Sequence, residues 1–261
     1  MLPVLLQPCY VISDVHLGYA PESVEQSLLT FLRALPGRAG SLLINGDLFE
    51  FWFEWRSVVP RSGVRVLAAL MDLRDAGIPM TMIAGNHDCW GGDVLRDAGV
   101  EFQFGPWTGV LGGWRARVEH GDGLRPHEDR GYRALRRVLR NGLAIRAFRA
   151  LHPDWATWLA VGSAQRSRDY QPRDGGSGLR AVATAELRAD PSLELLIYGH
   201  SHVAALERMP SGNVYANAGS WLDAPMYLVV TPEQITLRRM DGSPEGVDLH
   251  TVDRRSEKAM P

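Results

Sequence analysis

Short apolar runs alternate with amphipathic segments along the first third of the chain. Residues 9–13, 41–45 and 80–84 are rich in aliphatic side chains, and each run leads into small or polar residues, which is typical of buried strands that end in loops. Between them, residues 24–35 and 64–76 carry apolar side chains at helical spacing and are followed by glycine and proline. This β-α-β-α-β order predicts a largely parallel sheet with helices on its faces.

A different pattern follows in the second half of the chain. Apolar and polar residues alternate along residues 113–119, 193–198, 213–216, 226–230 and 234–238. Such alternation predicts a second sheet that is antiparallel or mixed. Two sheets packed face to face, with helices outside, would bring the loops that follow the strands to one rim, where open α/β sheets bind ligands.

A third region lacks any strand pattern. Residues 123–178 are rich in arginine and carry apolar side chains at helix-like intervals, ending in a glycine-rich stretch at 173–178. We expect an inserted helical cap here, with one apolar face and one arginine-rich face. The core is then formed by residues 1–122 and 179–240, and the polar segment 241–261 is expected to be a frayed tail.

Bulk composition excludes several classes of protein. The chain has 261 residues and a formal net charge of −2, which gives no general case for binding nucleic acid or a membrane surface. Its two cysteines are too few for a disulfide framework. No run of about 18 apolar residues is present, and residues 1–8 resemble the lead into a strand more than a signal peptide. We therefore expect a cytoplasmic protein.

Metal-ligating residues follow the predicted strands at several places. They are Asp14-Val15-His16, Gly46-Asp47, Gly85-Asn86-His87-Asp88, His120-Gly121-Asp122 and Gly199-His200-Ser201-His202. Each block alone is weak evidence, since Asn and Asp also favour ordinary turns. Together they supply carboxylate, imidazole and amide-oxygen ligands from separate loops, which is what a hydrolytic site with two divalent cations requires.

These blocks, in this order, resemble the calcineurin-like metallophosphoesterases, and the resemblance runs from the first strand to about residue 220. It implies an α/β fold, a four-layer α/β/β/α sandwich, here with the inserted helical cap. The first implied cation site consists of Asp14, His16, Asp47 and His202. The second consists of Asp47, Asn86, His120 and His200.

The implied chemistry explains the residue types. Asp47 can serve both cations because a carboxylate has two oxygens, and cations about 3.5–4 Å apart can share the hydroxide that attacks phosphorus. Asn86 adds a neutral oxygen, which limits the negative charge of the site. His87 would protonate the leaving oxygen or stabilise transition-state charge, and Asp88 would orient His87 or a ligand histidine. The resemblance favours two manganese ions, and the ligand set leaves iron, zinc and magnesium open.

A narrower resemblance rests on residues 44–52, with their Gly-Asp-Leu-Phe-Glu-aromatic-Trp run, on Asp-Arg-Gly-Tyr at 129–132, and on the arginine-rich insertion. These features are similar to the UDP-2,3-diacylglucosamine pyrophosphohydrolases of the lipid A pathway. The implied reaction gives a lipid monophosphate and UMP. The candidate substrate contacts are Asn86, His87, Asp129, Tyr132, Arg166 and Arg168.

In this interpretation the cap offers apolar side chains, including Phe148, Trp155 and Trp158, to the acyl chains and arginines to the diphosphate. A basic amphipathic cap also suits peripheral contact with the inner membrane. The alternative is that its apolar face only packs on the core and its arginines are solvated. The aromatic stretch 51–55 likewise lines the substrate pocket or packs beneath the cap.

The residue after Asn86 leaves the substrate open, because that family typically has arginine where this chain has His87. A broader phosphodiesterase or phosphatase acting on soluble substrates such as nucleotides is the alternative. A nuclease is weaker, since no basic stripe with interleaved aromatic residues is present and no nucleic-acid partner is expected. A metal-binding scaffold without activity is the non-enzymatic alternative, although no ligand position is lost.

Overall fold

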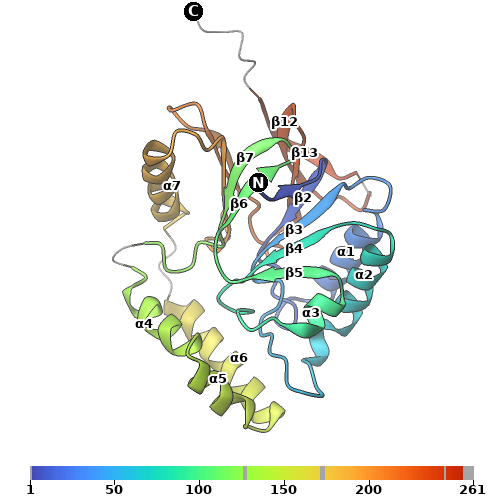
Figure 1. Cartoon of the computed structure of the whole chain (residues 1–261), viewed down its shortest axis with the longest axis vertical. Coiled ribbons are helices and arrows are strands. Elements are labelled where there is room, and N and C mark those ends of the chain that lie inside the picture. The colour runs from blue at the N-terminus through green and yellow to red at the C-terminus, as the bar shows by residue number, and fades with distance from the viewer. Residues whose placement is uncertain (1, 126–127, 171–173, 244, 255–261) are drawn as a thin grey trace, which may run out of the picture.

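The computed structural model describes residues 2–125, 128–170, 174–243 and 245–254, with the backbone alone for residues 164–170. The body of the molecule has four layers, with helices outside two packed sheets, as Figure 1 shows. The α/β/β/α sandwich expected from the sequence is therefore confirmed.

One sheet has seven strands, in the order β13-β12-β11-β2-β3-β4-β5. Their bounds are β2 (Cys9–Ile12), β3 (Ser41–Asn45), β4 (Met80–Ile83), β5 (Val100–Gln103), β11 (Met226–Val230), β12 (Gln234–Arg239) and β13 (Val247–Asp253). From β2 to β5 the neighbours are parallel, because α1 (Glu22–Arg33), α2 (Val64–Asp75) and the short α3 (Asp93–Asp97) carry the chain back between them. A 3-10 turn, η1 (Arg61–Gly63), leads into α2.

The other sheet has six strands, in the order β1-β6-β7-β8-β10-β9. Their bounds are β1 (Val4–Leu5), β6 (Trp107–Leu111), β7 (Trp114–Val118), β8 (Leu195–Tyr198), β9 (Ala205–Arg208) and β10 (Val214–Asn217). It mixes parallel and antiparallel pairs, as the alternating pattern predicts. Helix α7 (Ser177–Ala189) packs its buried Leu179, Ala183 and Leu187 on its outer face.

Strand β2 shows how the layers form from the sequence. Cys9 and Val11 belong to the core between the two sheets, whereas Tyr10 and Ile12 belong to the core beneath α1 and α2. Successive strand residues point to opposite faces, so a strand buried on both sides has to be apolar throughout. The continuous apolar run in the sequence is thus the signature of a middle layer.

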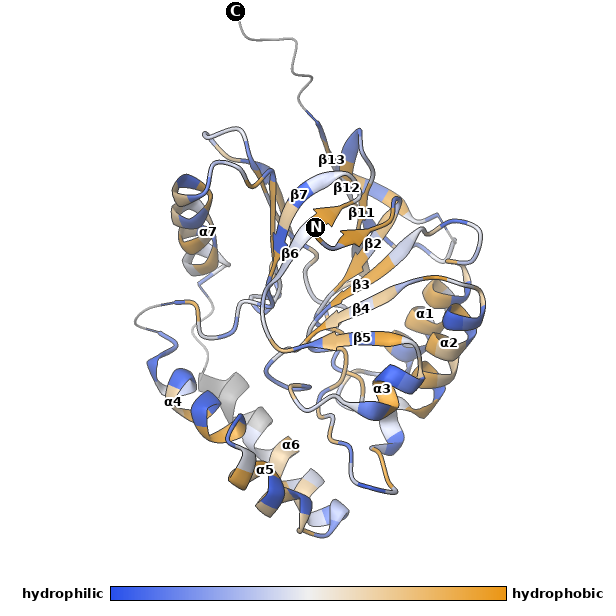
Figure 2. Cartoon of the chain, viewed as in Figure 1, coloured by the Kyte–Doolittle hydropathy of each residue, from blue (hydrophilic) through white to orange (hydrophobic). Residues whose placement is uncertain are grey.

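Three helices stand apart from the four layers: α4 (Arg130–Leu139), α5 (Gly142–Arg149) and α6 (Pro153–Tyr170) (Figure 1). They fall within the expected insertion, and Figure 2 shows both hydrophobic and hydrophilic residues on them. No helix in the described part of the chain is both long and apolar enough to cross a membrane. The division into a core and a cap stays an interpretation of the sequence.

The expectation of a frayed tail from residue 241 is wrong for Val247–Asp253. This segment is β13, which pairs antiparallel with β12 along its length. Val247 and Leu249 alternate with Asp248 and His250, which is a short strand pattern inside a polar segment, but among the side chains of this strand only Val252 is buried. Backbone hydrogen bonds to β12 provide the pairing instead. Beyond the strand, Arg254 places Nη2 2.6 and 2.8 Å from the two carboxylate oxygens of Glu194.

Candidate metal centre

The ends of five strands bring the predicted ligands together. In the seven-stranded sheet, β2, β3 and β4 are parallel, so the loops that carry Asp14, Asp47 and Asn86 leave the same edge. In the other sheet, the parallel strands β7 and β8 lead to His120 and His200. The two sheets are stacked, and these edges meet. Backbone hydrogen bonds join the loops, among them Gly199 N–H to the His120 carbonyl at 2.8 Å.

Unusual backbone conformation marks the same residues. Among the described non-glycine residues, those with positive φ are Asp14 (54°), His16 (56°), Asp47 (52°), His200 (61°) and His202 (61°). Such left-handed residues cost free energy and persist only where the surrounding structure demands them, so they cluster at functional sites. All of them belong to the ligand set predicted from the sequence.

Two glycines allow the loops to approach one another. A Cβ atom on Gly85 would overlap the Asp47 carboxylate, and one on Gly46 would overlap the ring of His120. Glycine at these positions therefore serves the close approach of the loop backbone to neighbouring ligands.

One group of donor atoms lies around His16. Its Nε2 is 3.1 Å from Nε2 of His202 and 3.9 Å from Oδ2 of Asp47. Nε2 of His202 in turn is 3.4 Å from Oδ1 of Asp14. One ligand atom each from Asp14, His16 and His202 lies within 4.8 Å of the others. Two imidazole nitrogens that face each other beside carboxylates form a donor set that suits a divalent cation.

A second group lies around His120. Its Nε2 is 3.1 Å from Oδ2 of Asp47 and 3.3 Å from Oδ1 of Asn86. The same Asn86 oxygen is 2.9 Å from Nδ1 of His200. Asp47 thus faces both groups, and the seven predicted ligands form two adjoining clusters. The donor types fit two cations that share one carboxylate.

Outer hydrogen bonds set the tautomers of two histidines. Nδ1 of His16 lies 3.1 Å from Oε2 of Glu50, and Nδ1 of His120 lies 2.8 Å from the carbonyl oxygen of Asn45. Carboxylate and carbonyl oxygens only accept, so Nδ1 carries the proton in both rings and Nε2 is left as the ligand atom. Glu50 was not predicted as a site residue, because its contact with His16 spans 34 residues of sequence.

His87 lies at the edge of the clusters. Its backbone N–H donates to Oδ1 of Asp47 at 2.9 Å, and its Nδ1 donates to the carbonyl oxygen of Glu50 at 3.1 Å. The ring meets that of His16 edge-on, with centroids 4.8 Å apart. Nε2 is consequently the nitrogen with which His87 can act on a bound substrate.

The expected contact of Asp88 with a histidine is not what its hydrogen bonds show. The carboxylate accepts the backbone N–H of Leu48 at 2.7 Å, of Gly85 at 2.9 Å and of Asp47 at 3.2 Å. Burial, together with the charge of Asp47, raises the pKa of Asp88 to about 7. Asp88 therefore ties the loop of Asp47 to the loop of Asn86, and it acts on the ligands through the backbone.

Charge interactions favour ligand-competent carboxylates. Burial opposes ionisation of Asp47, but His120, His87 and His16 outweigh it and hold the pKa well below its usual range. The pKa of His120 is lowered by burial and raised more strongly by Asp47, and it ends well above its ordinary value. Burial and the neighbouring His120 lower the pKa of His200 to about 4. Asp47 is thus ionised, as a bridging ligand has to be.

The remaining candidate substrate contacts lie in the added helices or at their start. Asp129 is bound by Arg125, with Nη2 to Oδ1 at 2.8 Å. The Tyr132 hydroxyl donates to Oδ2 of Asp122 at 2.7 Å. Arg166 and Arg168 lie in α6, where their side chains are outside the described residues. Asn86 and His87 belong to the metal centre itself.

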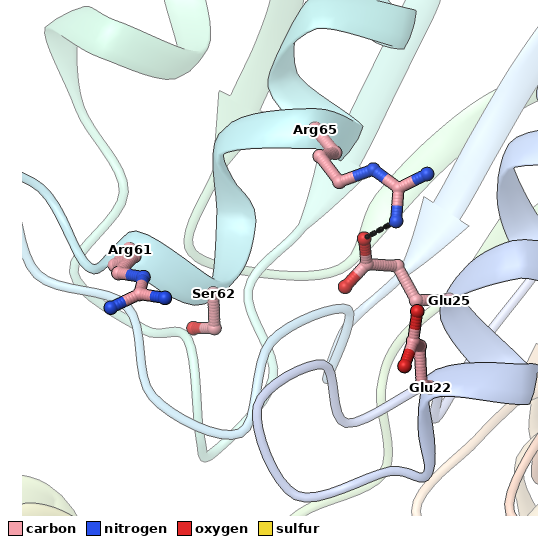
Figure 3. A pocket seen from close by; sticks show the side chains of 5 residues that line it. All are labelled: Glu22, Glu25, Arg61, Ser62 and Arg65. Carbon is pink, nitrogen blue, oxygen red and sulfur yellow. Dashed lines mark ion pairs between the residues drawn. The ribbon is translucent and has the colours of Figure 1, made fainter.

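A pocket of about 460 Å³ lies beside the N-termini of α1 and α2. Figure 3 shows its lining, in which Arg65 pairs with Glu25 at 3.0 Å while Glu22, Arg61 and Ser62 complete the wall. Its acidic and basic side chains compensate each other, and no predicted ligand lines it. This pocket is therefore separate from the candidate metal centre.

Comparison with known proteins agrees with this geometry. A family model described as calcineurin-like phosphoesterase matches residues 8–204. The chain belongs to the calcineurin-like phosphoesterase family.

Curated relatives cover most of the chain. The UDP-2,3-diacylglucosamine hydrolase of Porphyromonas gingivalis is 29% identical over an alignment of 255 positions, which covers 89% of this chain and 97% of the relative. The protein of that name from Neisseria meningitidis is 31% identical over an alignment of 204 positions, which covers 76% of this chain and 83% of the relative. Among solved structures, the phosphoesterase Yfce of E. coli has a TM-score of 0.47 at 14% identity, covering 95% of this chain and 98% of its own.

Family membership and the donor clusters together define the activity. The chain is a metal-dependent phosphoester hydrolase, and its donor clusters are groups that could hold divalent metal ions. The prediction of a hydrolase from the sequence blocks is confirmed.

Proposed function

We propose that this hydrolase cleaves the diphosphate of UDP-2,3-diacylglucosamine and releases UMP and a lipid monophosphate. The observation that carries the proposal is the length of the match to relatives named for that substrate, which is 89% of the chain for the Porphyromonas protein. The unmatched share is smaller than the segment 123–178, so the match includes part of the added helices as well as the catalytic core.

In the proposed reaction, the oxygen of water forms a bond to the α-phosphorus. The bond from that phosphorus to the bridging oxygen breaks, and the lipid phosphate leaves with the bridging oxygen. Divalent cations held by the two clusters would supply an activated water and positive charge for the phosphoryl oxygens.

The side chains of the protein have their own part in this scheme. Asp47 holds the two clusters next to each other because it lies near both His16 and His120. Asn86 presents a neutral oxygen to the second cluster. His87, held through Nδ1 by the Glu50 carbonyl, can donate from Nε2 to the bridging oxygen as it leaves.

Exposed apolar side chains on the added helices support a lipid substrate. Leu143, Trp155 and Trp158 are 73%, 73% and 77% exposed. Large exposed apolar groups on neighbouring helices are uncommon unless they contact a ligand, a partner or a membrane. We propose that this surface receives acyl chains and allows peripheral contact with an anionic membrane, to which the arginines of α4 add attraction.

One residue favours a second candidate function. His87 stands where the narrower family typically has arginine, and histidine would serve equally for small phosphodiesters or phosphomonoesters. A broader phosphodiesterase or phosphatase acting on soluble substrates is the resulting alternative.

A paired turnover assay separates the two. The wild-type enzyme with Mn²⁺ is given UDP-2,3-diacylglucosamine in detergent, with UMP as the measured product, and in parallel bis(4-nitrophenyl) phosphate. We expect a kcat/KM for the lipid nucleotide at least about a hundredfold higher, since remote binding energy adds to the reaction at phosphorus. Hydrolysis of the small diester without release of UMP would instead establish the broader enzyme.

A further inference from the structure

Phe148 of α5 lies inside a cage of four aromatic rings. Its centroid is 5.0 Å from that of Phe53, 5.2 Å from Trp90, 6.1 Å from Phe51 and 6.4 Å from Trp55. These separations are those of attractive aromatic pairs. Of the two expectations for the aromatic stretch 51–55, packing beneath the added helices is therefore the one that the structure shows.

The walls of the cage belong to the loops that carry the metal centre. Phe51, Phe53 and Trp55 follow Asp47 in the chain, and Trp90 comes three residues after His87. Phe51 and Phe53 are 5% and 1% exposed, so these two rings of the wall are buried. The loops of Asp47 and His87 are also joined at this place by an isolated bridge between Phe53 and Trp90. Phe148 therefore packs against both loops at once, and its contacts fix the position of α5 relative to them.

Further contacts connect the same helices to the same region. The indole N–H of Trp90 donates to the carbonyl oxygen of Leu139, at the end of α4, at 2.8 Å. The guanidinium of Arg149, next to Phe148, lies 5.7 Å from the ring centre of Phe53. At the start of α4, Tyr132 donates to Asp122, two residues after His120. Both ends of α4 and the end of α5 are thus attached next to candidate ligands.

We propose that Phe148 is a positioning residue, which sets α4 and α5 at a fixed place relative to the metal centre through its aromatic cage. The inference rests on the proposed function, because a lipid nucleotide is a substrate that has to reach the metal centre and the helices at the same time. A small diester reaches the metal centre alone. Misplacement by about 1 Å can cost a bridging substrate about a hundredfold in rate, while it leaves the small substrate unaffected.

The test compares Phe148→Ala with Phe148→Leu and with Arg146→Gln, an exposed neighbour on α5, in the Mn²⁺-loaded enzyme. For Phe148→Ala we expect the KM for UDP-2,3-diacylglucosamine to rise at least about tenfold. Its kcat/KM for bis(4-nitrophenyl) phosphate should stay within about twofold, with unchanged bound manganese, because Phe148 belongs to neither donor cluster. Leucine should restore most of the loss, and the Arg146 variant should match wild type.

A double-mutant cycle shows whether Phe148 acts through the cage. In a Phe53→Leu background, Phe148→Ala should add less than about half of its effect on KM, since the two rings are in contact. Full additivity would overturn the assignment. So would an equal loss on both substrates, which would place the effect of Phe148 on the metal centre rather than on the helices.

Limited proteolysis keeps the proposal testable if the lipid nucleotide is not a substrate. Trypsin should cut at the arginines of α4 and α5 at least about fivefold faster in Phe148→Ala than in wild type, since local opening exposes those bonds. An unchanged rate would overturn the positioning role. Failure of wild type to release UMP would overturn the proposed function alone.

Discussion

Oδ2 of Asp47 lies 3.1 Å from Nε2 of His120, with both side chains almost completely removed from solvent. Each stabilises the charged form of the other, which lowers the pKa of Asp47 and raises that of His120. The same oxygen lies 3.9 Å from Nε2 of His16. The pair therefore joins the two donor clusters, and its removal should separate them.

Replacing Asp47 by asparagine keeps the shape of the side chain and removes its negative charge. We expect hydrolysis of either test substrate to fall by about a thousandfold, because weaker binding of the cations removes positive charge beside the reacting phosphorus. Elemental analysis after gel filtration should show bound metal falling from two ions per chain toward one or fewer. Retention of both ions with normal turnover would contradict the shared-ligand assignment.

Glu50 to glutamine tests the outer contact of His16. Glutamine can accept from Nδ1 only through a neutral amide oxygen, so the contact that fixes the tautomer of the ring is weaker. Changes at such outer partners typically reduce metal affinity or activity by roughly 10–100-fold. Titration of the metal-depleted variant with Mn²⁺ measures the affinity directly. A matched control is Glu101→Gln on β5, an exposed carboxylate for which we expect wild-type affinity.

The two cysteines should be unreactive in the folded protein. Burial raises the pKa of Cys9 to about 12, and burial together with the charge of Asp88 raises that of Cys89 to about 12. At pH 8 only about one thiol in ten thousand is then a thiolate, the form that reacts. A disulfide reagent should modify both thiols only after denaturation. Rapid modification of the native enzyme would show that one of them is accessible.

The same pKa shifts have a consequence for alkaline stability. A thiol whose pKa is raised in the folded state favours folding below its unfolded value, near 8.5, and this contribution is lost as the pH rises toward 12. Cys9→Ala and Cys89→Ala should therefore reduce the decline in the free energy of unfolding above about pH 9. Denaturant titrations at pH 8 and pH 10 measure the difference.

Truncation after residue 240 removes β13. The loss of Val252, which is 9% exposed, from the core between the sheets should lower the free energy of unfolding by about 2 kcal/mol. It would also leave β12 as an uncovered edge, which favours aggregation. Urea denaturation and light scattering measure the two effects, and truncation after Arg254 is the control. Equal stability of the two truncated proteins would show that β13 contributes little.

Trp155→Ser and Trp158→Ser test the proposed membrane contact. Loss of one partly inserted aromatic side chain should weaken binding to anionic vesicles by about tenfold. Hydrolysis of bis(4-nitrophenyl) phosphate should be unchanged because neither side chain belongs to the donor clusters. Co-sedimentation with phosphatidylglycerol vesicles measures binding. Equal sedimentation of wild type and both variants would remove the membrane from the proposal.

The local pattern of apolar and polar residues was sufficient to predict the central strands and helices and the types of metal ligand. The predicted strand at 41–45 matches β3, and the helix expected at 64–76 matches α2 (Val64–Asp75) within one residue. Both elements are buried on the faces that their apolar residues define, so periodicity alone identifies them. The ligand blocks were visible because parallel strands deliver their following loops to one edge.

Long-range partners could not be obtained in this way. Asp88 bonds to backbone about 40 residues away, and Phe148 meets rings from two loops far from it in sequence. Neither contact leaves a local trace, since an acidic residue after histidine or a phenylalanine in a helix has many ordinary explanations. Strand β13 was missed for a related reason, because its order derives from the backbone of its neighbour.

The left-handed backbone at Asp14, His16, Asp47, His200 and His202 places stability and activity in opposition at the same positions. Glycine would relieve the strain there by about 1 kcal/mol or more at each position. Stability design that considers only the folding free energy of the metal-free chain would therefore favour glycine at these sites. The resulting protein would lose its ligands and its turnover of substrate. Any thermostabilised version of this enzyme has to gain its stability elsewhere and carry these five strained residues unchanged.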